Sequence, residues 1–282
     1  MAVLDFLRWQ NRSFLDIVRA DRERKDAAAL RHRYYQDRQI EDLLRLIGRS
    51  WAAESVKDFR PFFINIVRKI VNKRAMVYAA APWREFKGLD QDAGDALYRA
   101  MGANVILKKA NRLTKLHKTT LLQVRWNEAR EVPTLAVVTP NIADAVYDDP
   151  EDPERLIVTH PGTREQDTTY SDWTAETWVR RDWRGQAIPA QGNPDGINPY
   201  GILPFVPLFD SVPDDEFFVR GGDDLIEAQR AINVALTNLW RAIEWNSHGQ
   251  AWMSGEGVNK DDPFDRTPFG PQTVLRLPAG GE

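Results

Sequence analysis

The 282-residue sequence predicts an α+β protein in which helix-rich ends enclose a strand-rich middle third. Apolar residues recur at helical spacing among charged residues up to about residue 117. From residue 120 to 183, β-branched and apolar segments alternate with turn signals, and residues 223–246 form one long amphipathic pattern. The composition, 43% hydrophobic and 28% charged, is typical of a globular chain with a buried core.

The first part of the chain predicts helices with a break between them. Residues 14–47 favour two helices and a joint, because the sequence at residues 34–37 interrupts the apolar spacing. The next helix is expected to begin at Pro61, since proline is well tolerated in a first turn, and to extend through Val77. Pro82 should then prevent the helix from continuing.

The chain is expected to pass from helix to strand near residue 118. Residues 91–117 carry a helical apolar pattern, although Gly94 and Gly102 weaken its continuity. Thr120–Trp126 and Val132–Val138 are β-branched and apolar, and the short polar segment between them predicts a hairpin.

The middle third predicts a mixed sheet interrupted by polar loops. An acidic loop with two prolines is expected at residues 148–154, irregular structure at 186–199, and an extended segment at 202–208, where residues preceding proline avoid the helical region. Further strands are expected at residues 143–147, 156–160 and 177–183.

The clearest predicted element is a helix from Asp223 to Asn246, about 36 Å long at ~1.5 Å per residue. Asp223 is a favourable N-cap. One face is apolar and is expected to pack, whereas the opposite face has charges of both signs and is expected to be solvated. The apolar face comprises Leu225, Ala228, Ile232, Ala235, Leu236, Leu239 and Ile243. From helix phase alone, the residues expected to line a channel or contact another subunit are Glu227, Arg230, Thr237, Asn238, Arg241 and Glu244.

The carboxyl end predicts the beginning of another substructure. Residues 247–270 are rich in turn signals, and residues 272–278 predict a strand. A strand in this position has no expected pairing partner, so the sequence is expected to be part of a longer chain.

Charge is distributed unevenly along the sequence. The net charge is +7 over residues 1–80, +4 over residues 81–140 and −14 over residues 141–282. This polarity favours either different environments for the two ends, including nucleic acid, or head-to-tail contact between copies, although a solvated surface explains it equally well. No apolar run approaches the ~18 residues of a membrane span, and Asp5 and Arg8 interrupt the start, so we expect cytosolic synthesis and no membrane partner.

The sequence carries no recognisable catalytic motif. It contains neither G-x-x-x-x-G-K-[ST] nor G-x-S-x-G, its histidines are scattered singly, and it has no cysteine. We therefore expect no enzyme activity, cofactor or metal site. Two alternatives stay open: a nucleic-acid-binding module that uses the basic amino-terminal helices, among them Arg68, Lys69, Lys73 and Arg74, and a carbohydrate-active enzyme that uses paired carboxylates such as those of Asp214-Asp215-Glu216.

Four segments occur in a definite order along the chain. They are Tyr34-Tyr35 followed by Ile40; Asn65-Ile66-Val67 with Val71-Asn72, Val77-Tyr78 and Pro82; Asn198-Pro199-Tyr200-Gly201-Ile202-Leu203-Pro204-Phe205-Val206; and Gly222-Asp223-Asp224-Leu225-Ile226 through Asn233. Taken in this order, they resemble the landmarks of bacteriophage portal proteins, in the large group with a tyrosine pair near the start. Asp37 stands where that family usually has glycine.

The resemblance implies the amino-terminal part of a head–tail connector. It implies a portal-like wing domain, with helices and a mixed β-sheet, over residues 1–222, a first stem helix over 223–246, and the beginning of a small α/β clip over 247–282. A portal forms a homo-oligomeric ring, usually of twelve copies, at one capsid vertex of the virion, and it is assembled in the host cytoplasm. The implied partners are the double-stranded DNA that is packaged and ejected, the terminase motor, the major capsid protein, and neck, adaptor or tail proteins.

Overall fold

The computed structural model describes residues 13–49, 61–78, 80, 82–190, 192–247, 251–255 and 274–278. Its described parts form two compact units, one within residues 1–38 and 65–227, the other within residues 39–64 and 228–282. The expected wing, residues 1–222, therefore contributes to both units, because residues 39–64 belong to the second unit.

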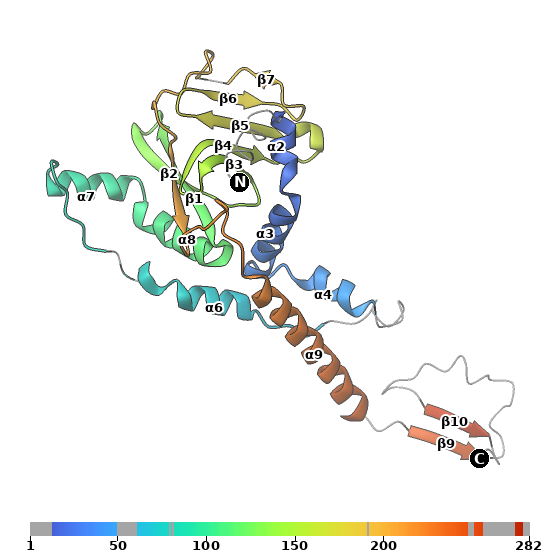
Figure 1. Ribbon diagram of the computed structural model, residues 1–282. Helices are drawn as coiled ribbons and strands as arrows, with labels where there is room; N and C mark the ends of the chain where they lie inside the picture. Colours follow the sequence, from blue (N-terminus) through green and yellow to red (C-terminus); the bar gives the residue numbers. More distant parts are fainter. Residues whose placement is uncertain are drawn as a thin grey trace. The chain divides into compact units, whose positions relative to one another are not determined.

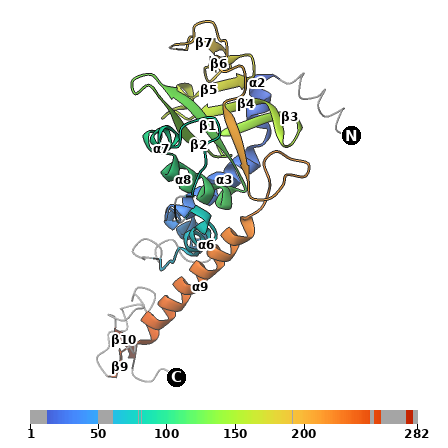
Figure 2. The ribbon, with the colours of Figure 1, turned by 90° about the vertical axis from the view of Figure 1, so that its left-hand side faces the viewer.

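The chain is an α+β protein (Figure 1). In the first unit, helix α8 packs against strands β1 and β2, and helices α3 and α6 pack against α8 (Figures 1 and 2). None of the helices in the described ranges is long and apolar enough to cross a membrane. The α-helices are α2 (Phe14–Ala20), α3 (Arg22–Tyr35), α4 (Ile40–Ile47), α6 (Ile66–Arg74), α7 (Gln91–Ala100), α8 (Ala103–His117) and α9 (Asp223–Ser247).

The strands of the first unit form two antiparallel sheets, so the expectation of a mixed sheet there is wrong. Short hairpins join most of the consecutive strands, and such hairpins impose antiparallel pairing. One sheet has the order β2-β1-β8 and the other the order β3-β4-β5-β6-β7. The strands are β1 (Thr119–Asn127), β2 (Val132–Val138), β3 (Ala143–Asp149), β4 (Asp152–His160), β5 (Thr169–Thr174), β6 (Trp178–Arg181), β7 (Ala187–Ile188) and β8 (Phe205–Phe209).

A hydrophobic core joins the inner faces of these two sheets. It contains Leu121 of β1, Phe205 of β8 and Leu156 and Trp173 of the larger sheet, together with Phe217. Alternating strand residues reach this core from both sheets because successive side chains of a strand point to opposite faces. A separate cluster joins α3, α6, α8 and the start of α9 through buried apolar side chains.

Several sequence predictions differ from the structure at element ends. Helix α6 begins at Ile66 and not at Pro61, because the Asn65 side chain caps it by accepting a hydrogen bond from the Arg68 backbone N–H at 2.8 Å. The helix expected over residues 91–117 is divided at Gly102, whose φ of 63° lies outside the helical region. Most of the acidic segment 148–154 lies in β3 and β4, which meet in a tight turn, and was wrongly expected to be a loop.

The strand predicted near the carboxyl end is present as β10 (Val274–Pro278). It pairs in parallel with β9 (Ala251–Gly255), so the expectation that it has no partner is wrong. Strand β9 falls in the region that turn signals marked as irregular.

Candidate functional site

The candidate site is the surface of helix α9, where the sequence placed its functional residues. The described part of the second unit contains most of this helix and the extended segment 61–64. An extended segment that pairs with no strand leaves backbone N–H and C=O groups that need partners. Polar side chains of α9 supply these partners.

Three polar residues spaced four apart form the buried face of the helix, which we call the polar seam: Gln229, Asn233 and Thr237. The Thr237 hydroxyl donates to the Phe62 carbonyl at 2.9 Å, and the Gln229 amide donates to the Ile64 carbonyl. The Asn233 side-chain oxygen accepts from the Ile64 N–H at 3.2 Å. All three side chains are buried, at 1%, 1% and 0% exposure, so the polar face of α9 packs within the chain.

A buried carboxylate lies beside this seam. Asp42 of α4 accepts from the Arg230 guanidinium at 2.8 Å and also pairs with Arg45. Only 3% of the Asp42 side chain is exposed, and removing one partner of such a buried pair is costly. Arg230 therefore contributes to the packing of the second unit.

A second face of α9, beside the seam, is apolar and exposed. We call this face the apolar stripe: Ala228, Ile232, Ala235, Leu239 and Ile243, at the spacing of one helix face. Leu239 is 57% exposed and Ile243 51% exposed. Exposed apolar surface that is continuous along an element is typical of a site for a protein partner.

The structure separates the six residues that helix phase had grouped. Thr237 is fully buried, so its expected solvation is wrong, and Arg230 is half-buried against Asp42. Glu227, Asn238 and Glu244 are exposed, and Arg241 is half-buried. Whether any of them lines a channel or contacts another subunit stays a prediction.

Sequence reasoning missed Gln229 and Asn233 as buried residues. Their signal was available, because polar residues at positions 229, 233 and 237 share one helix face, but polarity alone suggested solvent. The apolar face was expected to pack, and its outcome is divided. Leu225 packs against the buried cluster and Leu236 is half-buried, whereas the five residues of the apolar stripe are exposed. The polar face is buried in its place because residues 62 and 64 present backbone N–H and C=O groups to the helix, and polar side chains can form hydrogen bonds with them.

The histidines and the basic residues of α6, which the sequence analysis also considered, form no catalytic or metal-binding group among the described residues. His32 and His117 meet, with 3.4 Å between Nδ1 and Nε2, although the sequence suggested isolated histidines. Within the described ranges, no group of three or more His, Cys, Asp or Glu residues could hold a metal ion. The four cations marked on α6 are all exposed, and Arg68 pairs with Asp37 at 2.8 Å.

Comparison of the chain with known protein families and with curated proteins finds no match.

Proposed function

We propose that this chain belongs to a ring-forming structural assembly, in which copies pack through the apolar stripe of α9. The observation that carries the proposal is the orientation of this helix. Its polar face is occupied by the segment 61–64, and its apolar face is left exposed. A second copy would remove this apolar surface from water, which is favourable by about 25 cal/mol per Å².

The particular assembly proposed is the bacteriophage portal, of which the chain would be the amino-terminal part. In this assignment, residues 1–222 form the wing, residues 223–246 the first stem helix, and residues 247–282 the beginning of the clip. The acidic carboxyl half suits a DNA channel, because a wall that repels phosphates avoids adhesive, counterion-releasing contacts. The roles of the residues are positional, and no catalytic group is assigned.

Backbone geometry at the tyrosine-pair segment supports this proposal. Asp37, at the position where the family usually has glycine, has a φ of 64°. This left-handed conformation is the one that glycine adopts without strain and that aspartate tolerates. The departure from the family pattern is therefore compatible with the same local backbone.

The Asn198–Val206 segment also has a structural role that fits the resemblance. The buried Asn198 amide donates to the carbonyls of Thr174 and Ile202, both at 2.8 Å, and its oxygen accepts from the Tyr200 N–H at 3.0 Å. One side chain thus fixes the turn that leads into β8. Such a role explains why asparagine, proline and glycine occur together here.

The experiment that tests the proposal is mass photometry and negative-stain electron microscopy of the purified protein. The expected result is a ring with a central hole and about twelve copies, since most homo-oligomers are closed and symmetric. A monodisperse monomer over the whole concentration range contradicts the proposal. It would favour the second candidate, a nucleic-acid-binding module.

The second candidate depends on the exposed cations of α6, Lys69, Lys73 and Arg74. It predicts binding of double-stranded DNA that weakens steeply with salt, because phosphate contacts release counterions. Substituting all three by glutamine should make the plot of log K against log salt concentration less steep. The expected change in slope is about 3, since each phosphate contact contributes about 0.9. Binding that is absent or insensitive to salt excludes this candidate.

A further inference from the structure

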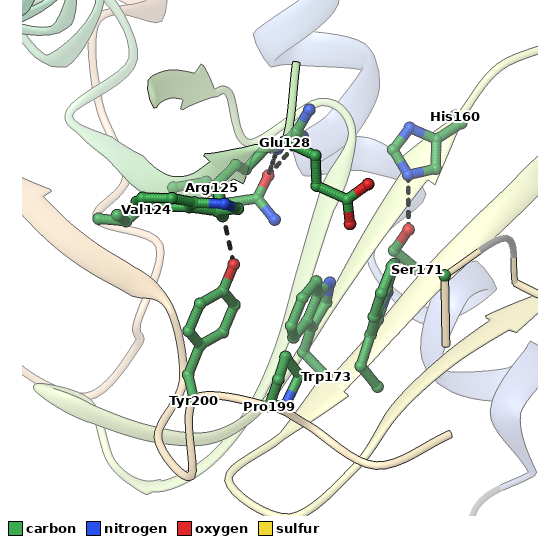
Figure 3. Close-up of a pocket in the computed structure, with 12 residues that line it drawn as sticks. Val124, Arg125, Glu128, His160, Ser171, Trp173, Pro199 and Tyr200 are labelled. Carbon is green, nitrogen blue, oxygen red and sulfur yellow. Dashed lines mark hydrogen bonds between the residues drawn. The ribbon is translucent and has the colours of Figure 1, made fainter. Parts of the chain in front are cut away.

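The first unit contains a cavity of about 650 Å³ that is formed by residues of its two sheets and of neighbouring loops (Figure 3). Its volume lies in the range of small-molecule sites. Figure 3 shows Arg125 and Tyr200 on one side, His160 and Ser171 on the other, and Trp173 between them. Gln123 and Trp173 are buried, Val124, His160, Ser171 and Trp178 are half-buried, and Arg125, Trp126, Glu128, Gly192, Pro199 and Tyr200 are exposed.

Two indole groups lining the cavity have donors without acceptors. The rings of Trp173 and Trp178 stack with centroids 4.9 Å apart and an interplanar angle of 12°. In the described part of the chain, the buried Nε1–H groups of both rings have no hydrogen-bond partner. Buried tryptophan N–H groups usually find an acceptor, and leaving one unpaired is costly. Because both nitrogens are also closed to solvent, the indoles present ring surface, and not their N–H groups, to a ligand in the cavity.

The rim provides hydrogen-bond donors that a ligand can reach. The Tyr200 hydroxyl oxygen accepts from the Trp126 backbone N–H at 3.3 Å, which leaves the phenolic proton for another acceptor. The Arg125 guanidinium donates to the neutral Gln123 side-chain oxygen, with Nε at 2.7 Å. Among the described residues, no carboxylate forms an ion pair with Arg125. The hydrogen-bonding character of the cavity is thus dominated by donors.

The electrostatic character of the cavity is positive near His160. Burial lowers the pKa of His160, and the cations Arg125 and Arg180 lower it further. Partial burial of the guanidinium, whose residue is exposed at the rim, also lowers the pKa of Arg125. Ser171, on the neighbouring strand, lies 2.8 Å from the His160 Nε2 through its hydroxyl oxygen. Arg125 and Arg180 therefore make the surroundings of His160 favourable for an anionic group, and the one lining carboxylate among the described residues, Glu128, is exposed at the rim.

We propose that this cavity binds a small acidic ligand built on a flat ring, with the ring against the aromatic side chains and the acidic group near Arg125 and His160. A nucleoside monophosphate and an aromatic carboxylate share this chemistry. The site goes beyond the proposed structural role and does not depend on it.

The lining residues argue against two simpler ligands. A glycosidase needs two carboxylates across the scissile bond, and Glu128 is the one carboxylate among the described lining residues. A bare anion would leave the indole faces unused, since their contribution is stacking and apolar burial. The ring and the acidic group are therefore expected to be required together.

The test is isothermal titration calorimetry of the complete chain with four probes: uridine 5′-monophosphate, phenylacetate, uridine and inorganic phosphate. We expect saturable binding of at least one of the two ring acids. Uridine and phosphate should bind at least about tenfold more weakly, since each lacks one set of contacts. Equal binding of phosphate and the ring acids, or no binding of either acid, overturns the proposal.

Matched variants assign the binding to this cavity. Arg125→Gln and Trp126→Ala each remove an exposed rim side chain and should weaken binding at least about tenfold. Arg22→Gln and Trp83→Ala remove an exposed cation and an exposed indole that do not line the cavity, and should bind like the parent chain. Unchanged binding by both rim variants, with a native circular dichroism spectrum, overturns the proposal.

His160 provides an independent readout. A bound anion should raise the pKa of His160, which burial and then the cations Arg125 and Arg180 hold down in the absence of ligand. NMR titration of its imidazole should therefore show a higher pKa with ligand. Phenylacetate, whose carboxylate stays ionised over this range, should bind more tightly at pH 6 than at pH 8. An unshifted His160 pKa at saturating ligand contradicts the assigned position of the acidic group.

Discussion

At the scale of single residues, Asp37 shows how one side chain can combine an unusual backbone conformation with specific hydrogen bonds. Asp37 follows the end of α3 with φ in the left-handed region, and its carboxylate accepts from the Asn65 amide at 2.6 Å and from Arg68 at 2.8 Å. It therefore combines a conformation that suits glycine with contacts that glycine lacks. The contacts and the conformation can be separated by substitution.

Asp37→Gly and Asp37→Ala remove the same carboxylate, but alanine keeps the strain of a positive φ. The glycine variant should therefore be more stable than the alanine variant by about 1 kcal/mol. Urea unfolding followed by circular dichroism measures the difference. Equal stability of the two variants would show that this backbone conformation is not maintained.

His117 couples stability to pH. Burial lowers its pKa well below the usual value, and Arg31 and His32 lower it further. In the unfolded chain the imidazole takes up a proton near pH 6.5, whereas in the folded protein it stays neutral. The contribution to the free energy of unfolding is thus complete above pH 6.5 and decreases as the pH falls below that value.

The free energy of unfolding should decrease between pH 7 and pH 5, with about 1–2 kcal/mol of the decrease due to His117. His117→Gln should flatten this dependence. Urea unfolding at pH 7, 6 and 5 provides the measurement, with His160→Gln as the comparison because that imidazole is only half-buried. An equally steep decrease in the His117→Gln variant refutes the assignment.

Among the elements, helix α9 shows how a neighbouring segment selects the buried face. Its polar seam satisfies backbone groups of residues 62 and 64, and its apolar stripe is exposed. Stacking of Trp240 on Phe62, with ring centroids 6.2 Å apart, adds an aromatic contact beside the seam. The helix is therefore held to this segment by hydrogen bonds and has apolar surface left for a partner.

Two substitutions on α9 distinguish the seam from the solvated surface. Thr237→Val keeps the shape of a fully buried side chain but leaves the Phe62 carbonyl without its donor, so it should lower the free energy of unfolding by about 1–2 kcal/mol. Asn238→Ala changes the exposed neighbour and should have an effect below about 0.5 kcal/mol. Thermal or urea unfolding compares them, and equal effects would contradict the assigned phase of the helix.

At the scale of the whole molecule, the proposed ring depends on surface that one copy does not cover. Leu239 and Ile243 lie on the exposed apolar stripe, where a charge would have to be buried in any assembly that uses it. A solvated position of the same helix tolerates a charge. Oligomerisation can therefore be tested without disturbing the folded chain.

Leu239→Glu should convert the ring into monomers while leaving the helical circular dichroism signal unchanged, because the side chain is 57% exposed in the single chain. Ala231→Glu introduces the same charge at an exposed position of the helix outside the stripe and should leave assembly intact. Mass photometry of both variants checks the expectation. If the two variants assemble equally well, the stripe is not the contact between copies.

Local signals in the sequence were sufficient for several elements. The hairpin of β1 and β2 and the helix α9 were predicted within a few residues of their observed ends, because strand alternation and helix periodicity are properties of short segments. The break near Asp37 and the division at Gly102 were indicated by turn residues and glycine. The sequence by itself therefore determined the α+β class and most of the element order.

Only the tertiary structure decided which surfaces are buried. Strand β5 carries polar and aromatic residues that gave no strand signal, and it is held by its neighbours β4 and β6. The seam of Gln229, Asn233 and Thr237 is buried because residues 62 and 64 present backbone groups to it. The aromatic cavity likewise forms from residues distant in the sequence. Helical or strand periodicity shows which side chains share a face. Whether that face is buried depends on whether the segment packed against it presents apolar side chains or unpaired backbone polar groups.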